Sequence, residues 1–146
     1  MQIENKRLHT ALIGCYAAHK RSCFQEFQKL NLTSGQPKVL SILFQNEGYL
    51  QKELADRCHV EPATITSILG NMMKKGFIRK EMVYVSGNKR AFAIYLTDLG
   101  RDMAIKVNKI TDDMEELSFR DFKDDDKKLL LELLNRIQSN LDHVGR

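Results

Sequence analysis

The most constraining feature of this sequence is a helical pattern at residues 62–75 whose two faces differ in chemistry. Apolar residues recur there at the period of one face of an α-helix: Ile65, Ile68, Leu69 and Met72. The opposite face carries small or hydrogen-bonding residues: Ala63, Thr66, Ser67, Gly70, Asn71 and Lys74. Pro62 stands at a favoured first helical position. The pattern predicts a helix that is anchored by one face and inserted into another molecule by the other.

A second, shorter helix is predicted just before this one, over residues 51–57. Residues 58–61 form the turn between them, and the longer helix ends at Gly76, because glycine tolerates the left-handed conformation of a helix cap. The two segments together predict a helix-turn-helix.

A β-hairpin is predicted after the helix-turn-helix, from the alternating segments 78–85 and 91–96. Gly87-Asn88 lie at its turn, and Lys89-Arg90 leave it. Basic residues on an exposed tip beside such a helix point to nucleic acid as the partner.

The positive charge of the chain is concentrated in this region. The 146 residues carry a net charge of +4; residues 50–91 hold 8 Lys/Arg against 4 Asp/Glu, whereas residues 92–146 hold 9 against 12. A polyanion would therefore be steered toward the helix-turn-helix and hairpin. No window is apolar enough to cross a bilayer. The 3 cysteines, in no metal or disulfide spacing, favour a cytoplasmic setting.

Two helices are predicted before the helix-turn-helix. The first spans about residues 4–30, where apolar residues recur at steps typical of a long amphipathic helix. The second begins after Thr33-x-x-Gln36, which matches a capping box, and ends at residues 46–48.

Two further helices are predicted after the hairpin. Thr97 caps a helix over residues 98–117, and a polar junction leads to a last helix over about 124–144. The last helix has a broad apolar face: Leu130, Leu133, Leu134, Ile137, Leu141 and Val144. Helices this apolar at both ends of the chain predict a homodimer, which would also supply two equivalent helices to a two-fold DNA site.

A series of short motifs follows in order along nearly the whole chain: Leu32-Thr33-x-x-Gln36-x-x-Val39-Leu40, Lys52-Glu53-Leu54-Ala55, Glu61-Pro62-Ala63-Thr64-Ile65-Thr66, Lys75-Gly76-Phe77-Ile78, Asn88-Lys89-Arg90 and Leu96-Thr97-Asp98-Leu99-Gly100. In this order and at these spacings they resemble the MarR family of winged helix-turn-helix transcription regulators. The resemblance implies an obligate dimer clasped by its N- and C-terminal helices, with recognition helices in successive major grooves and wings in adjacent minor grooves. It also implies repression that a ligand or oxidant relieves.

The sequence departs from the family pattern at three positions. Asn88 stands where the wing usually has an aspartate that braces its arginine. Ser67 stands where an arginine commonly follows the recognition-helix threonine. Lys80 replaces a usual arginine, while Arg79 lies one place earlier.

The front of the predicted recognition helix favours modest direct readout of bases. Guanine is usually read by arginine and adenine by asparagine or glutamine, and the front has neither. Methyl contacts and single hydroxyl hydrogen bonds are offered by Ala63, Thr64, Thr66 and Ser67, with the amide of Asn71 deeper in the helix. We therefore hypothesise that much of the specificity comes from Arg90 in a narrow, A/T-rich minor groove. The candidates for phosphate contacts are Lys52, Arg57, Lys74, Lys75, Arg79, Lys80 and Lys89; for any one of them the alternative is a solvated face.

Other kinds of site have less support. Cys15 and Cys23 lie on the apolar stripe of the first helix, which favours buried packing over thiol sensing; the same comparison applies to Cys58. The histidines do not cluster, so no metal or cofactor is predicted, and no nucleophile elbow, phosphate-binding glycine loop or carboxylate pair predicts an enzyme. Possible liners of a ligand pocket between the dimer helices and the winged module, each of which would otherwise be core, are Tyr16, His19, Phe24 and Phe44.

The sequence therefore predicts a mainly α fold with a small β-hairpin wing, in a single MarR-like domain over residues 1–146. Residues 1–32 and 118–146 would form dimerisation helices, 33–97 the winged helix-turn-helix, and 98–117 a connecting helix. The predicted function is a cytoplasmic, sequence-specific regulator of transcription. It would be a dimeric repressor of a pseudo-palindromic operator, relieved by a small aromatic or phenolic effector. The alternatives are a winged-helix protein-interaction module or an oxidant-sensing module with weak or no operator binding.

Overall fold

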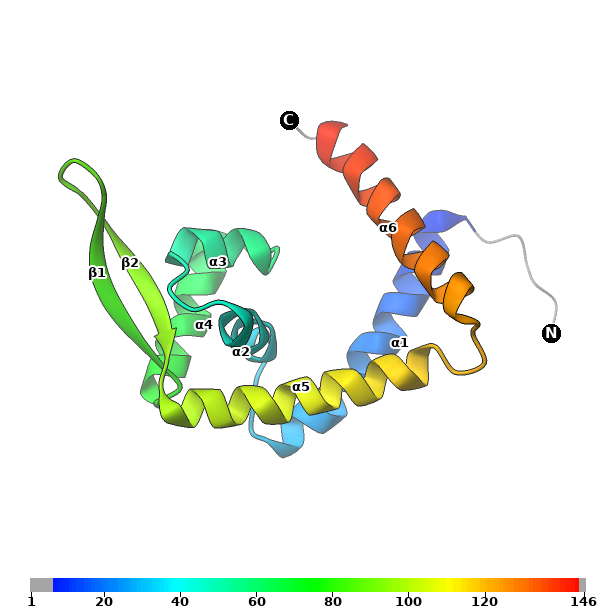
Figure 1. Cartoon of the computed structure of the whole chain (residues 1–146), viewed down its shortest axis with the longest axis horizontal. Helices are drawn as coiled ribbons and strands as arrows, with labels where there is room; N and C mark the ends of the chain where they lie inside the picture. The colour runs from blue at the N-terminus through cyan, green and yellow to red at the C-terminus, as the bar shows by residue number, and fades with distance from the viewer. Residues whose placement is uncertain (1–6, 145–146) are drawn as a thin grey trace. The chain divides into compact units, whose positions relative to one another are not determined.

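The computed structural model describes residues 7–144 and contains six helices and one antiparallel hairpin within that range (Figure 1). In chain order the elements are α1 (Leu8–Lys29), α2 (Gln36–Gln45), α3 (Gln51–Arg57), α4 (Pro62–Lys74), β1 (Ile78–Ser86), β2 (Lys89–Leu96), α5 (Asp98–Ser118) and α6 (Asp124–Val144). The predicted fold class is confirmed. The start of the predicted first helix, at residues 4–6, lies outside the described residues.

The chain divides into two compact units, Met1–Asp112 and Asp113–Arg146; the predicted single domain stays a prediction. The first unit contains α1–α4, the hairpin and most of α5; the second contains the end of α5 and α6. The whole helix-turn-helix and its wing lie in the first unit, so this unit carries the candidate site.

The core of the first unit anchors α4 by one face. The four apolar residues of its predicted stripe are at most 8% exposed: Ile65, Ile68, Leu69 and Met72. They pack in one cluster with residues of α2 and α3 that are fully buried: Val39, Leu40, Leu43 and Leu54. Burying a side chain of this size contributes about 1.5–3 kcal/mol. Since this face fixes α4 to the core, the opposite face is left free for a partner.

The hairpin is antiparallel, with Ile78 opposite Leu96 at its base and Ser86 opposite Lys89 at its tip. Both strands extend past their predicted ends, so that the turn is reduced to Gly87-Asn88. Gly87 adopts φ +56°, a conformation that costs glycine little because it lacks a Cβ. The hairpin projects away from the helices α2–α4, with its tip farthest from them (Figure 1).

Strand β2 is also bonded to the segment that precedes α3. The Gly48 N–H donates to the Ile94 carbonyl at 2.9 Å, and the Ile94 N–H donates to the Tyr49 carbonyl at 2.9 Å. Leu50 forms an antiparallel bridge with Ala93. The base of the wing is therefore fixed to the start of the helix-turn-helix.

The carboxylate of Glu47 connects the wing to α5. One of its oxygens accepts the backbone N–H of Leu96, at the end of β2, at 2.8 Å. The other forms an ion pair with Arg101, in the first turns of α5, at 2.8 Å. Both hydrogen bonds involve a charged group and are therefore stronger than neutral ones.

The junction between β2 and α5 is a close backbone approach. The Thr97 hydroxyl accepts the Gly100 N–H at 3.0 Å, which confirms the predicted cap. The Thr97 N–H donates to the Phe77 carbonyl at 3.0 Å. A Cβ added at Gly100 would lie 1.9 Å from that same carbonyl oxygen, so only glycine fits here.

The predicted capping box before α2 is only half formed. The Gln36 side chain accepts the Thr33 N–H at 3.1 Å, but no side chain caps the helix. The helix begins instead after Gly35, whose φ is +88°. A Cβ at Gly35 would lie 2.4 Å from the Ile68 side chain, so the chain turns into α2 while packed against α4.

Helices α1 and α6 each lack a buried residue within the described chain. Large apolar side chains are exposed on α1 (Leu8, Leu12, Ile13, Tyr16 and Phe24) and on α6 (Leu129, Leu130, Leu131, Leu133, Leu134, Leu141 and Val144). Several large exposed apolar side chains on one helix are typical of an interaction surface. Within residues 7–144, no helix combines the length and apolar composition needed to span a membrane.

Candidate nucleic-acid interface

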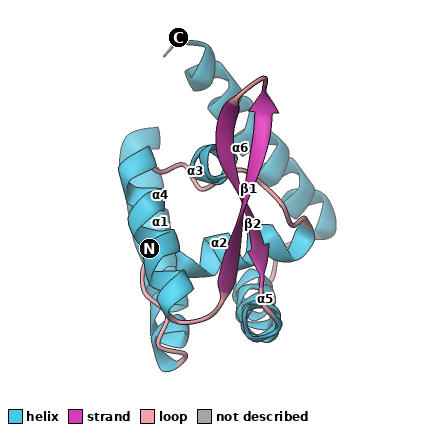
Figure 2. Cartoon of the chain, turned by 90° about the vertical axis from the view of Figure 1, so that its left-hand side faces the viewer, coloured by secondary structure: helices cyan, strands magenta, loops and turns pink. Residues whose placement is uncertain are grey.

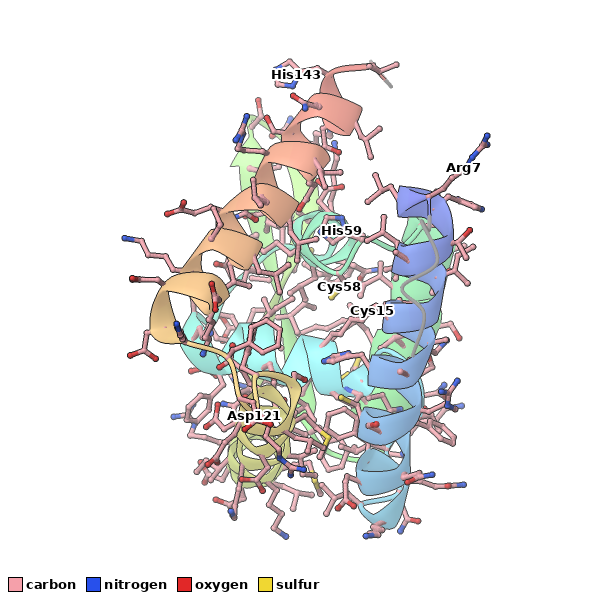
Figure 3. All side chains as sticks on the ribbon, turned by 90° about the vertical axis from the view of Figure 1, so that its right-hand side faces the viewer. Arg7, Cys15, Cys58, His59, Asp121 and His143 are labelled. Carbon is pink, nitrogen blue, oxygen red and sulfur yellow. The ribbon has the colours of Figure 1, made fainter. Side chains whose placement is uncertain are left out.

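The turn between α3 and α4 is held by backbone hydrogen bonds. The Cys58 N–H donates to the Leu54 carbonyl at 2.9 Å, and the Val60 N–H donates to the Ala55 carbonyl at 3.0 Å. His59 takes the left-handed conformation, with φ +54°. Figure 3 labels Cys58 and His59 at this turn. The short turn lets α4 start at Pro62 with its first residues exposed.

The face of α4 that the sequence assigned to a partner is exposed in the described chain. Its exposed residues are Ala63, Thr64, Thr66, Ser67, Asn71 and Lys74. A Cβ added at Gly70 would meet nothing within 4 Å. The face therefore has space for another surface to approach the α4 backbone closely.

Thr66, near the middle of this face, is hydrogen-bonded within the protein. Its hydroxyl donates to the Pro62 carbonyl at 2.9 Å and accepts the side-chain N–H of Gln51 at 2.9 Å. Gln51 is the first residue of α3 and was not among the predicted site residues. No local sequence signal pairs it with Thr66, because the two are 15 positions apart and on different helices.

Two cations of the predicted phosphate set lie over aromatic rings. The Arg57 guanidinium carbon is 4.4 Å from the ring centroid of Tyr49, and the Lys80 ammonium is 5.4 Å from that of Phe92. Such cation–π contacts reduce the freedom of a long side chain and contribute about 0.5–1 kcal/mol at an exposed site. The rings therefore hold these two charges in place at the surface.

Arg79 has two partners within the protein. Its guanidinium lies 4.5 Å from the ring centroid of Tyr95 and forms an ion pair with Glu81 on the same strand. A carboxylate beside the arginine offsets part of the charge that it would present to a polyanion.

Lys75, a predicted candidate for a phosphate contact, is hydrogen-bonded within the protein. Its ammonium donates to the Asn31 carbonyl at 2.6 Å and to the side-chain oxygen of Gln36 at 3.1 Å. Asn31 follows the end of α1 in the left-handed conformation, and Gln36 is 1% exposed. Lys75 thus joins the end of α4 to the α1–α2 junction, and these two hydrogen bonds compete with the predicted phosphate contact, which stays a prediction.

The wing tip presents exposed cations. Lys89 and Arg90 are both exposed, and Arg90 lies opposite Tyr84 in the strand register. A bulge between Tyr84 and Ser86 interrupts the register just before the turn. Figure 2 views the hairpin with its two strands in front of the helices, crossing along their length. With Lys52 and Lys74, which are also exposed, these side chains stay candidates for nucleic-acid contacts.

The three cysteines differ in environment. Cys58 is buried at 2% exposed, and burial raises its pKa, although Lys38 opposes this in part. Cys23 is half-buried, and burial raises its pKa as well. Cys15 is exposed on α1, so the prediction that it is buried is wrong for the single chain (Figure 3). A raised pKa keeps a thiol protonated and unreactive at neutral pH.

The four predicted pocket residues are exposed in the described chain, and their role in a pocket stays a prediction. Tyr16 is 60%, Phe24 48% and Phe44 42% exposed, and His19 is also exposed. None of the four borders the hollow beside α2 and α3, whose walls include Tyr49 and Arg57. Within residues 7–144, no three His, Cys, Asp or Glu side chains lie together as metal ligands would.

A helix-turn-helix with an exposed second helix, followed by a basic β-hairpin, defines the winged helix-turn-helix class of DNA-binding proteins. The model of the MarR family matches residues 32–82, from the end of α1 into β1. Over these residues, which include the whole helix-turn-helix, the chain is similar to the MarR family.

A curated relative and two solved structures are also similar to this chain. The uncharacterized HTH-type transcriptional regulator YybA of Bacillus subtilis (strain 168) is 26% identical over 117 residues, which are 80% of this chain and 77% of YybA. The crystal structure of MarR is 26% identical, with a TM-score of 0.79, and covers 99% of this chain and 97% of its own. The structure of the S. aureus MepR–DNA complex has the same fold, with a TM-score of 0.81 at 21% identity, over 94% of this chain and 99% of that chain.

Proposed function

We propose that this protein is a sequence-specific DNA-binding regulator that binds a pseudo-palindromic duplex as a homodimer and represses transcription. The observation that carries the proposal is the exposed, small and polar face of α4, which along the chain follows the cations of α3 and precedes those of the wing. A face of this kind fits the major groove, where base edges are read. MepR, which shares the fold, was solved in complex with DNA.

The side chains divide into those that fix the protein on DNA and those that discriminate bases. Phosphate contacts are assigned to cations that the structure leaves at the surface: Lys52, Arg57, Lys74, Arg79, Lys80 and Lys89. Base contacts are assigned to the front of α4, at Ala63, Thr64, Thr66, Ser67 and Asn71. Arg90 is assigned to the minor groove, where a narrow A/T-rich groove attracts an arginine.

The homodimer is supported by the apolar surfaces of α1 and α6. Neither helix has a buried residue, and both expose several large apolar side chains. A second copy of the chain would cover these surfaces by two-fold symmetry. It would also bring two α4 helices to one duplex, which doubles the number of phosphate and base contacts.

We also propose that the protein is cytoplasmic and that a small aromatic or phenolic effector relieves repression. The support for this part is the family resemblance. An effector can release DNA only if it binds the DNA-incompetent state more tightly than the competent one. Effector binding must therefore weaken as DNA concentration rises, which is a measurable reciprocal effect.

The proposal is tested by selecting bound fragments from a random DNA pool and measuring the protein's mass in solution by sedimentation. We expect a dimer and an enriched two-fold sequence with half-sites about 10 base pairs apart, one turn of the duplex. A monomer, or a pool with no enriched sequence, would contradict the proposal. A stable dimer that binds no DNA would support a protein-interaction module instead.

Two neighbouring wing variants separate base readout from phosphate contact. Arg90→Ala should relax the preference at one outer operator position by roughly 1–3 kcal/mol. Lys89→Ala should weaken all sequences alike and lower the salt dependence by about one unit. Competition assays against a panel of operator variants, repeated over a range of salt, measure both. Identical profiles for the two variants would remove the distinct role of Arg90.

A further inference from the structure

The hydrogen bonds of Thr66 limit what this residue can do in a groove. A hydroxyl has one hydrogen to donate and two lone pairs that accept. The Thr66 hydrogen is committed to the Pro62 carbonyl at 2.9 Å, and one lone pair accepts from Gln51 at 2.9 Å. In this state Thr66 cannot donate to the acceptors that guanine, adenine and thymine present in the major groove.

Two parts of Thr66 are left for a base: one lone pair, which can only accept a hydrogen bond, and the methyl group. Thr66 is exposed, and its neighbours one helical turn away along the same face are Ala63 and Gly70. Both are small, and Gly70 has open space where a Cβ would be. A base edge can therefore approach the methyl group without meeting a larger side chain first.

We propose that Gln51 is a positioning residue for base readout: it holds the Thr66 hydroxyl inside the protein so that the Thr66 methyl contacts a thymine methyl. This inference rests on the proposed DNA binding and assigns the base at one position of each half-site. The C5-methyl of thymine is the one apolar group that a base pair of unmodified DNA shows in the major groove. Gln51 contributes to specificity through Thr66, from a different helix.

The test exchanges thymine for uracil, which lacks only that methyl group, at each position of a selected operator. One position per half-site should weaken binding to the wild-type protein by about fourfold, the equivalent of burying one CH₂ group. The ratio of affinities for the two DNAs is compared within each variant. A general change in affinity or in the fraction of folded protein therefore cancels.

Four single variants and one double variant define the expected pattern. Thr66→Ser keeps the hydroxyl and loses the methyl, so its thymine-to-uracil ratio should fall to about one. Thr66→Val keeps a methyl and needs no hydrogen bond, so its ratio should stay near that of the wild type. Gln51→Ala should lower the ratio, and so should Gln51→Glu, which has the same shape but no N–H to donate. In the Thr66→Val background, Gln51→Ala should have no effect on the ratio.

Lys52→Ala serves as the matched control, because Lys52 is the exposed neighbour of Gln51 on α3. This variant should weaken binding to every DNA of the set and leave the thymine-to-uracil ratio unchanged. A thymine-to-uracil ratio equal to that of the wild type in Thr66→Ser, or in both Gln51 variants, would overturn the inference. The proposed DNA binding would still stand in that case. If the wild-type protein enriched no sequence from the pool, the proposed function would fail and the inference with it.

Discussion

Replacement of Lys75 by methionine should destabilise the protein without reducing its electrostatic contact with DNA. The Lys75 ammonium donates to the Asn31 carbonyl at 2.6 Å and to the Gln36 side chain at 3.1 Å. Methionine keeps much of the apolar stem and removes the charge and both donors. Gln36 keeps its hydrogen bond from the Thr33 N–H, at 3.1 Å, so the buried amide oxygen is not left without a partner.

The expected cost of Lys75→Met is about 1–2 kcal/mol in the free energy of unfolding. Hydrogen bonds to a charged group contribute roughly 1.5–3 kcal/mol, and Lys75 is exposed enough for water to replace part of that. With a denaturant dependence of about 1–3 kcal/mol per molar urea, the midpoint should fall by about 0.5–1 M. Urea unfolding followed by circular dichroism measures this, at one fixed protein concentration because a dimer's stability depends on concentration.

Lys74→Met is the matched control, since Lys74 is the preceding residue and is exposed on the contact face of α4. Its unfolding free energy should stay within about 0.5 kcal/mol of the wild type. Its DNA binding should lose about one unit of salt dependence, whereas that of Lys75→Met should keep the wild-type slope. The internal role of Lys75 is refuted if Lys75→Met unfolds at the wild-type urea concentration and loses the same salt dependence as Lys74→Met.

Three further predictions follow from glycine packing and thiol burial. Gly100→Ala should lower the free energy of unfolding by about 3 kcal/mol or more, measured in urea, because its Cβ would lie 1.9 Å from the Phe77 carbonyl oxygen. Gly70→Ala should raise the free energy of unfolding by about 0.5–1 kcal/mol, since its Cβ enters open space within a helix. The same substitution should weaken DNA binding in a shift assay. In the folded protein at neutral pH, Cys58 should be alkylated more slowly than a model thiol, because burial raises its pKa. Its alkylation rate should rise only at more alkaline pH. Mass spectrometry measures the rate, and a rate equal to that of the model thiol would contradict the prediction.

The elements of the fold could be predicted from the sequence because their signals are local. The apolar stripe of α4, Pro62 at its start and Gly76 after its end lie within one short segment, and α4 forms at Pro62–Lys74. Thr97 caps α5 as predicted: its hydroxyl accepts the N–H of Gly100, three residues further along the chain. Hydrophobic period and end residues suffice for such features, since each acts through neighbours within a turn or two.

The contacts that refine the candidate site could not be predicted in this way. Lys75 and Asn31 are 44 positions apart, and Gln51 and Thr66 are 15 apart. Whether a surface lysine is free or bonded depends on which backbone carbonyl the fold brings to it, and periodicity carries no such information. For the same reason, the sequence did not predict that Arg57 lies over the Tyr49 ring.

The capping box before α2 failed for a different reason. Thr33 and Gln36 have the correct spacing, but Gly35 takes the last position before the helix, with φ +88°, close to Ile68. Tertiary packing against α4 sets the direction in which the chain enters α2, and this overrides the local preference for a threonine cap. The hydrogen bond of the motif that does form is the one from the Thr33 N–H to the Gln36 side-chain oxygen. The same oxygen also accepts a hydrogen bond from Lys75.

The double contact of Glu47 has a mechanical consequence for allosteric control. The same carboxylate binds the last N–H of the wing strand and the Arg101 side chain of α5 at 2.8 Å each. The wing base and the first turns of α5 should consequently rotate as one lever. A signal that turns α5 about its own axis would swing the hairpin tip, far from the pivot, through the largest arc.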